Sequence, residues 1–146
     1  MSDDTGALTA TDQMIDLARM ALEFLSQHRH RHLPDIRWMD LEFRRIVSSY
    51  SQIELHTAPH GTEVAAAWAS ALGVAVQFED CGSSVRCSVS AEFAGYSLRI
   101  NCGWLNHGEA WRLLLPLDLE LPDGGTVDVD PARLLPADAP DSGGAR

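Results

Sequence analysis

The sequence has no lysine, few cysteines and no long apolar run, and each absence narrows what the chain can be. All eleven basic residues are arginine, which together with abundant alanine, glycine and leucine is typical of a GC-rich genome. The longest purely apolar run, Val64 to Ala69, is far shorter than the roughly 20 residues that span a membrane. The first residues, MSDDTGALTATDQ, are acidic where a secretory signal is basic, so we predict a cytoplasmic protein.

Motifs of known enzyme chemistry are also missing. The sequence has no glycine-rich phosphate loop, no nucleophile elbow and no Cys-x-x-Cys pair. The groups of potential metal ligands are His28 with His32, His56 with His60 and Glu63, and Cys81 and His107 with Cys87 and Cys102. The cysteine spacings match no zinc knuckle. We therefore predict no catalytic residue, no cofactor and no metal, and keep a metal-dependent enzyme as a third hypothesis.

The charge of the chain argues against a general affinity for nucleic acid. The formal net charge is -10, whereas phosphate binding draws its free energy from cationic side chains that release counterions. The acid is unevenly spread, however. Residues 28–45 contain three acids and five arginines: Arg29, Arg31, Arg37, Arg44 and Arg45. A local basic patch at 28–45 therefore keeps a nucleic-acid-associated regulator as the alternative function.

Length and composition predict one folded domain. A chain of 146 residues with 45% hydrophobic and 22% charged residues can bury a core of its own without a disulfide or a metal. We predict a disordered N-terminus at residues 1–10, a single α+β domain at 11–136, and a disordered acidic tail at 137–146.

The N-terminal part of the chain has the periodicity of an amphipathic helix. Apolar residues recur at helical spacing from Met14 to Leu25, and either Thr9 or Thr11 can cap the helix. Its apolar face is wider than a small sheet covers, which favours a partner protein or a homodimer. Residues 36–57 fit either a helix or a hairpin, and we prefer the hairpin.

The rest of the chain alternates like a sheet with one further helix. Residues 62–72 predict a helix, and residues 74–79 alternate as a half-buried strand. Leucines at every second position of 115–121, the turn PDGG and two alternating valines at 127–129 predict an extra C-terminal hairpin. The predicted fold is therefore α+β, with an N-terminal amphipathic helix and a mainly antiparallel sheet. One further helix packs on one face of that sheet, in a ββαβββ-like core.

The stretch CSVSAEFAGYSLRINC, residues 87–102, predicts a hairpin around a two-residue turn at Ala94-Gly95. In that register one face is apolar, with the pairs Phe93:Tyr96, Ala91:Leu98, Val89:Ile100 and Cys87:Cys102. The other face is polar, with the pairs Glu92:Ser97, Ser90:Arg99 and Ser88:Asn101. The distance across the cysteine pair permits a disulfide, but a reducing compartment opposes one. We predict buried free thiols, with a disulfide or a metal site as alternatives.

Two tryptophans, Trp104 and Trp111, bracket the polar stretch WLNHGEAW. Our first interpretation is that both are buried and anchor a loop. Tryptophan is also enriched at binding hot spots. The predicted partner-binding residues are therefore these two tryptophans together with Arg29, Arg31, Arg37, Arg44 and Arg45.

Three stretches of the chain resemble small uncharacterised proteins of GC-rich actinobacteria, their phages and plasmids. They are LPDIRW (Leu33–Trp38), AAWASALG (Ala66–Gly73) and the hairpin EFAGYSLRI. The resemblance covers residues 33–102 and implies two strands, a helix and three further strands. It implies no reaction and no ligand, so it assigns no functional residue.

These observations favour a small acidic cytoplasmic protein that binds another protein, or itself as a homodimer. One specific version is an inhibitor or modulator encoded by a phage or mobile element, which the charge and the resemblance suggest. The alternative is the nucleic-acid-associated regulator, in which the arginines of residues 28–45 touch phosphates. No membrane partner is expected.

Overall fold

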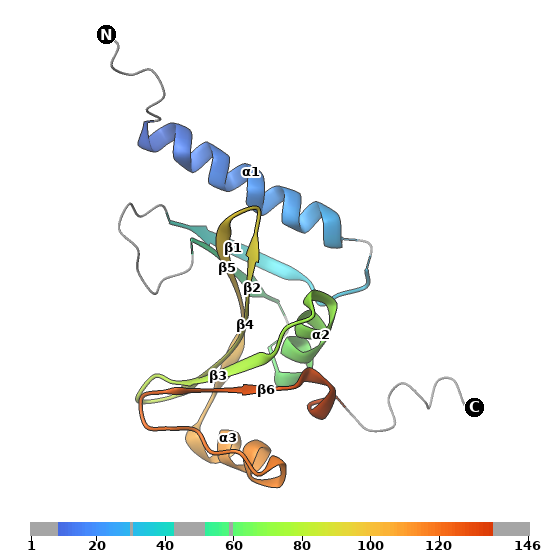
Figure 1. The fold of residues 1–146 in the computed structure, drawn as a ribbon, viewed down its shortest axis with the longest axis vertical. Coiled ribbons are helices and arrows are strands. Elements are labelled where there is room, and N and C mark those ends of the chain that lie inside the picture. Colours follow the sequence, from blue (N-terminus) through green and yellow to red (C-terminus); the bar gives the residue numbers. More distant parts are fainter. Residues whose placement is uncertain (1–8, 30, 43–51, 59, 136–146) are drawn as a thin grey trace, which may run out of the picture.

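The computed structural model describes residues 9–29, 31–42, 52–58 and 60–135 (Figure 1). Within these ranges the chain forms an N-terminal helix, a six-stranded sheet and two further α-helices, which confirms the predicted α+β class. In chain order the elements are α1 (Ala10–His28), β1 (Ile36–Leu41), β2 (Ile53–Thr57), α2 (Thr62–Leu72), β3 (Val76–Asp80), β4 (Val85–Phe93), β5 (Tyr96–Leu105), α3 (His107–Leu114) and β6 (Thr126–Val129). The run from β1 to β5 is the predicted ββαβββ-like core.

The sheet is mixed but mainly antiparallel. Its strands lie in the order β1-β2-β5-β4-β3-β6. All neighbouring strands run antiparallel except β2 and β5, which are parallel. After β2 the chain passes through α2, β3 and β4 before it returns as β5 beside β2. The parallel pairing of β2 with β5 therefore joins the β1–β2 hairpin and the β4–β5 hairpin into one sheet.

The first two helices cover the same face of this sheet. Thr9 caps α1 with a hydrogen-bonded capping box, and the residues of α1 that are fully buried are Leu17, Ala21 and Phe24. The ring of Phe24 lies 5.9 Å from the ring of Trp68 in α2 and 5.4 Å from that of Phe93 in β4. The indole nitrogen of Trp68 donates to the carbonyl of Pro34 at 3.0 Å. This aromatic cluster ties the C-terminal half of α1 to α2 and to the β4–β5 hairpin.

The hairpin prediction for residues 36–57 is confirmed. β1 and β2 pair antiparallel, with Met39 opposite Leu55 and Leu41 opposite Ile53. These apolar pairs place one side of the hairpin on the core. The competing helix relied in part on positions within 43–50, which lie outside the described residues.

The register predicted around the Ala94-Gly95 turn is confirmed for most of its length. Both turn residues have positive φ, +54° and +88°, as two-residue hairpin turns of this kind require. The pairs from Phe93:Tyr96 to Ser88:Asn101 form as predicted. The predicted Cys87:Cys102 pair is wrong, because β5 bulges there and Cys87 pairs with Gly103 instead.

The predicted C-terminal hairpin is also wrong. The stretch expected to be a loop forms α3, held at its start by a capping box between Asn106 and Glu109. The leucine-rich segment 115–121, expected to be a strand, instead begins with a short 3-10 turn at Leu115–Leu117. The chain then reverses at Asp118, which has a φ of +63°. The valines do form a strand, but β6 pairs with β3 at the edge of the sheet rather than with residues 115–121.

The terminal predictions fall mostly on residues that are not described. Residues 1–8 and 137–146 lie outside the described ranges, and the helix already begins at Ala10. In the described part of the chain, no helix has both the length and the apolar character to cross a bilayer.

Candidate functional site

The two faces of the sheet carry different side chains, because alternate residues of a strand point to opposite sides. On the face packed against the helices, which we call the core face, buried strand residues include Ile53, Leu55, Val76, Phe78, Cys87, Val89, Leu98 and Ile100. The register places polar residues and two tryptophans on the other face. We call this the open face: Trp38, Asp40, Glu54, His56, Gln77, Glu79, Arg86, Ser88, Ser90, Glu92, Ser97, Arg99, Asn101, Trp104, Thr126 and Asp128.

Charged side chains in the middle of the open face are paired across neighbouring strands. A guanidinium nitrogen of Arg99 lies 3.4 Å from one carboxylate oxygen of Glu54, and Asn101 donates to the other oxygen at 2.9 Å. Arg86 forms a second ion pair with Glu79. The side chains of Arg99 and Glu54 are only 12% and 22% exposed, so solvent screens this pair less than an ordinary surface pair.

Two aromatic side chains are held on the open face by polar neighbours. Trp38 stacks on His56, with ring centroids 4.4 Å apart and planes 10° apart. Nε2 of His56 lies 3.0 Å from a carboxylate oxygen of Asp40. At the other end, the guanidinium carbon of Arg86 lies 5.8 Å from the ring centre of Trp104. The two tryptophans remain 49% and 55% exposed.

The bulge in β5 decides which face Trp104 occupies. Without it, Trp104 would pair with Val85 and point to the core face; with it, Trp104 pairs with Arg86 on the open face. Bulges commonly redirect a side chain in this way. The bulge uses Gly103 at a φ of +130°, where a Cβ would lie 2.9 Å from the Cβ of His60. The interpretation of Trp104 as a buried anchor is therefore wrong.

Unused hydrogen-bonding capacity is concentrated on the same face. Among the described residues, the buried side-chain atoms without a hydrogen-bond partner are Arg86 Nε, Ser88 Oγ, Arg99 Nε and Asn101 Oδ1. Ser88 is fully buried; the register places Asn101 directly opposite it, and Arg86 lies two residues before it on the same strand. A buried polar atom that stays unpaired costs about 1–3 kcal/mol, so the centre of this face contributes an unfavourable term to stability.

The structure separates the predicted partner-binding residues. Trp104 lies on the open face, while Trp111 lies on α3 and is 62% exposed, so it is not a buried anchor either. The exposed arginines Arg29 and Arg31 follow the end of α1, and Arg37 lies at an irregularity in β1. Arg44 and Arg45 lie outside the described residues.

The histidine groups are held by neighbouring side chains. His28 packs against the rings of Phe24 and Trp68, and its burial, with Arg31 nearby, lowers its pKa. His56 contacts Asp40 on the open face, whereas His60 lies against Gly103. Across the described ranges, no three residues of the types His, Cys, Asp and Glu are grouped so that they could hold a metal ion.

The cysteines are free thiols, as the sequence predicted for Cys87 and Cys102. Both are buried, whereas Cys81 is exposed. Burial raises the pKa of Cys87 to about 12 and raises that of Cys102 as well. Both buried thiols therefore stay protonated at neutral pH and behave as small apolar side chains of the core.

Sequence reasoning missed most of the open face as a site. The alternation of the β4–β5 hairpin placed Ser88, Arg99 and Asn101 on a solvated side, but it could not supply their partners from other strands. Glu54 comes from β2, and Glu79 from β3. No local signal in the sequence joins β2 to the hairpin, and the pairing of β3 with β4 across the short turn at residues 81–84 was not predicted.

Comparison with known proteins adds no assignment. No protein-family model, no curated protein and no solved structure matches this chain. The resemblance to actinobacterial and phage proteins stays a prediction.

Proposed function

We propose that this chain is a protein-binding module that holds a basic partner protein on the open face of its sheet. The observation that carries the proposal is the placement of Trp104. A bulge built on Gly103 takes this side chain out of the core register and leaves it 55% exposed among polar groups. Burying a large apolar side chain contributes about 1.5–3 kcal/mol, so exposing part of an indole is unfavourable unless a partner covers it.

The charges of the open face support a basic partner. The face carries five carboxylates, from Asp40, Glu54, Glu79, Glu92 and Asp128, against two guanidinium groups, from Arg86 and Arg99. Both arginines are already paired with glutamates, so a phosphate backbone would meet net repulsion on this face. A cationic surface would instead be attracted by the face and by the net charge of -10.

The specific version that we favour is an acidic inhibitor or modulator of a nucleic-acid-binding protein, encoded by a phage or mobile element and acting in the cytoplasm. A protein that binds phosphates has a basic surface, and an acidic sheet face is complementary to such a surface. The resemblance of residues 33–102 to phage and plasmid proteins supports the same version.

The test is affinity purification of the tagged chain from its native host, with and without nuclease, followed by mass spectrometry. We expect one basic protein to be recovered in stoichiometric amount and to survive nuclease. Trp104→Ala should lower the affinity for it about 30-fold, since a tryptophan that acts as a binding hot spot contributes about 2 kcal/mol or more. Leu22→Ala is the matched control, because Leu22 is equally exposed at 57% but lies on α1.

Two outcomes would contradict this proposal. One is an isolated monomer with no recovered protein; the other is a recovered partner whose affinity is unchanged by Trp104→Ala. Size-exclusion chromatography with light scattering distinguishes a homodimer, which should also dissociate on Trp104→Ala if the open face forms it.

A nucleic-acid-associated regulator remains the second candidate, because Arg29, Arg31 and Arg37 are exposed. Replacement of Arg29 and Arg31 by alanine should then reduce the dependence of log affinity on log salt by about 0.9 for each phosphate that is no longer neutralised. If no DNA or RNA binds at low salt, this candidate is eliminated.

A further inference from the structure

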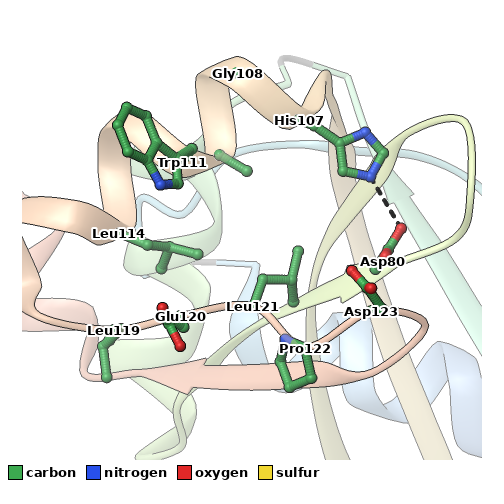
Figure 2. A pocket seen from close by; sticks show the side chains of 11 residues that line it. Asp80, His107, Gly108, Trp111, Leu114, Leu119, Glu120, Leu121, Pro122 and Asp123 are labelled. Atoms are coloured by element: carbon green, nitrogen blue, oxygen red, sulfur yellow. Dashed lines mark hydrogen bonds and ion pairs between the residues drawn. The ribbon is translucent and has the colours of Figure 1, made fainter.

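A second surface, separate from the open face, lies between α3 and the segment that follows it. A pocket of about 760 Å³ opens there, lined by one side of α3, the end of β3 and residues 119–123. Figure 2 shows Leu121 near the middle of the pocket, Trp111 and Leu114 on α3 toward one end, and Asp80 and His107 together at the other end. Glu120 and Asp123 also line it, from the returning segment.

The walls of this pocket are fixed by the fold. The Asn106–Glu109 capping box holds the start of α3, with hydrogen bonds of 2.8 and 2.9 Å. The amide of Leu119 donates to the carbonyl of Leu114 at 3.2 Å, which holds the returning segment against the helix. The pocket is therefore already formed without a ligand, which lowers the entropic cost of binding.

One carboxylate of the pocket is locked in place. Asp80 accepts hydrogen bonds from the amides of Gly82 and Gly124 at 3.0 and 2.9 Å, and Nε2 of His107 lies 3.0 Å away. These bonds, that of Gly124 foremost, lower the pKa of Asp80 to about 2. Asp80 is thus ionised at neutral pH, and Glu120 and Asp123 add two exposed carboxylates around the same cavity.

This combination selects a particular chemical group. An apolar middle with a half-open indole suits an alkyl stem, and the carboxylates suit a cation at its end. Arginine and lysine side chains have this composition, with an aliphatic stem that packs on apolar surface and a charged head. The exposed face of Trp111 can also attract a guanidinium or ammonium group directly.

We propose that this pocket receives an arginine or lysine side chain from a basic segment of a protein partner. The alkyl stem lies against Trp111 and Leu121, and the cationic head meets Asp123 and Asp80. The inference shares with the proposed function the expectation of a basic partner, but it concerns a different surface and is tested without that partner.

The test titrates the full chain with the blocked tripeptide Leu-Arg-Leu, observed by NMR with 15N-labelled tryptophan. Trp111→Phe assigns the indole signal. We expect a saturable shift of the Trp111 signal and none for the isosteric citrulline peptide, which lacks the charge. Raising the salt concentration should weaken the binding, because the carboxylates are partly solvent-exposed.

Paired variants locate the site. Glu120→Gln with Asp123→Asn removes two carboxylates that line the pocket, one of them beside the cationic head, and should weaken the peptide about five- to tenfold. The control, Glu92→Gln with Asp128→Asn, removes the same charge from the open face and should leave the affinity within about twofold. All four side chains are exposed, so the amide spectrum of each variant should show an intact fold.

The outcomes separate this inference from the proposed function. Equal binding of the citrulline peptide, an unmoved Trp111 signal at millimolar peptide, or equal loss in both paired variants would overturn the pocket assignment alone. Failure to recover a partner, or indifference of that partner to Trp104→Ala, would overturn the open-face proposal and leave the peptide result standing.

Discussion

On the core face of the sheet, side chains of β2, β4 and β5 are covered by helices, while on the open face the same strands hold their side chains through ion pairs and hydrogen bonds. The apolar side chains of the core face are removed from water, since its aliphatic residues are fully buried. The open face leaves four polar atoms unpaired and two tryptophans half exposed. The difference indicates that stability comes mainly from the core face, and the open face is the surface on which we propose that a partner binds.

The largest effect that can sharpen this comparison is expected on the core face. Phe78→Ala removes a fully buried ring and should lower the free energy of unfolding by about 3–5 kcal/mol. Gln77→Ala changes the next residue of β3, on the open face, and should stay within about 0.5 kcal/mol. Urea denaturation followed by circular dichroism measures both. Similar losses in the two variants would remove the distinction between the faces.

A smaller effect is expected where the bulge joins the two faces. Gly103→Ala places a side chain at a φ of +130° and 2.9 Å from the Cβ of His60, which should destabilise the fold by about 2 kcal/mol or more. Gly73→Ala is the control, because its φ of +71° is also left-handed but the space beside it is open. It should cost about 1 kcal/mol. Equal costs would show that the closeness of His60 adds nothing to the cost of a side chain at position 103.

An effect of opposite sign is expected at the centre of the open face. Ser88→Ala removes a fully buried hydroxyl that has no partner and should raise the free energy of unfolding by about 1 kcal/mol. Ser90→Ala, on the same strand and face but exposed, should be neutral. A loss of stability in Ser88→Ala would mean that the hydroxyl is satisfied in solution.

The smallest effect concerns Asp80. It is the last residue of β3 and lies on the same face of the sheet as Val76 and Phe78. Its folded-state pKa is about 2, below the ordinary value of 3.8. Its ionised form therefore stabilises the fold above the unfolded pKa, and this contribution is lost as the pH falls from about 4 towards about 2. Asp80→Asn should lower the urea midpoint slightly at neutral pH. The gap to the wild type should close below about pH 4, and a gap independent of pH would contradict this account.

Local patterns predicted much of the fold correctly. The register of the β4–β5 hairpin follows from a two-residue turn and strict alternation, so it needs no information from elsewhere in the chain. The hairpin at 36–57 likewise pairs two strands that are neighbours in the chain. A signal for α3 was also present, since Asn106 and Glu109 have the spacing of a capping box. The alternation of leucines at 115–121 was interpreted as a strand instead. In the structure these residues follow α3 and reverse direction, so that Leu119 lies against the end of that helix.

The sequence by itself determined the α+β class, the first two helices and the pairing near the hairpin turn, because each of these depends on residues close together in the chain. Only the tertiary structure decided the parallel pairing of β2 with β5, the place of β6 beside β3, and the bulge that moves Trp104 to the open face. These depend on contacts between distant residues, such as Gly103 with His60. The open face and the pocket are formed by residues that are far apart in the chain, so neither candidate site could be predicted from the sequence.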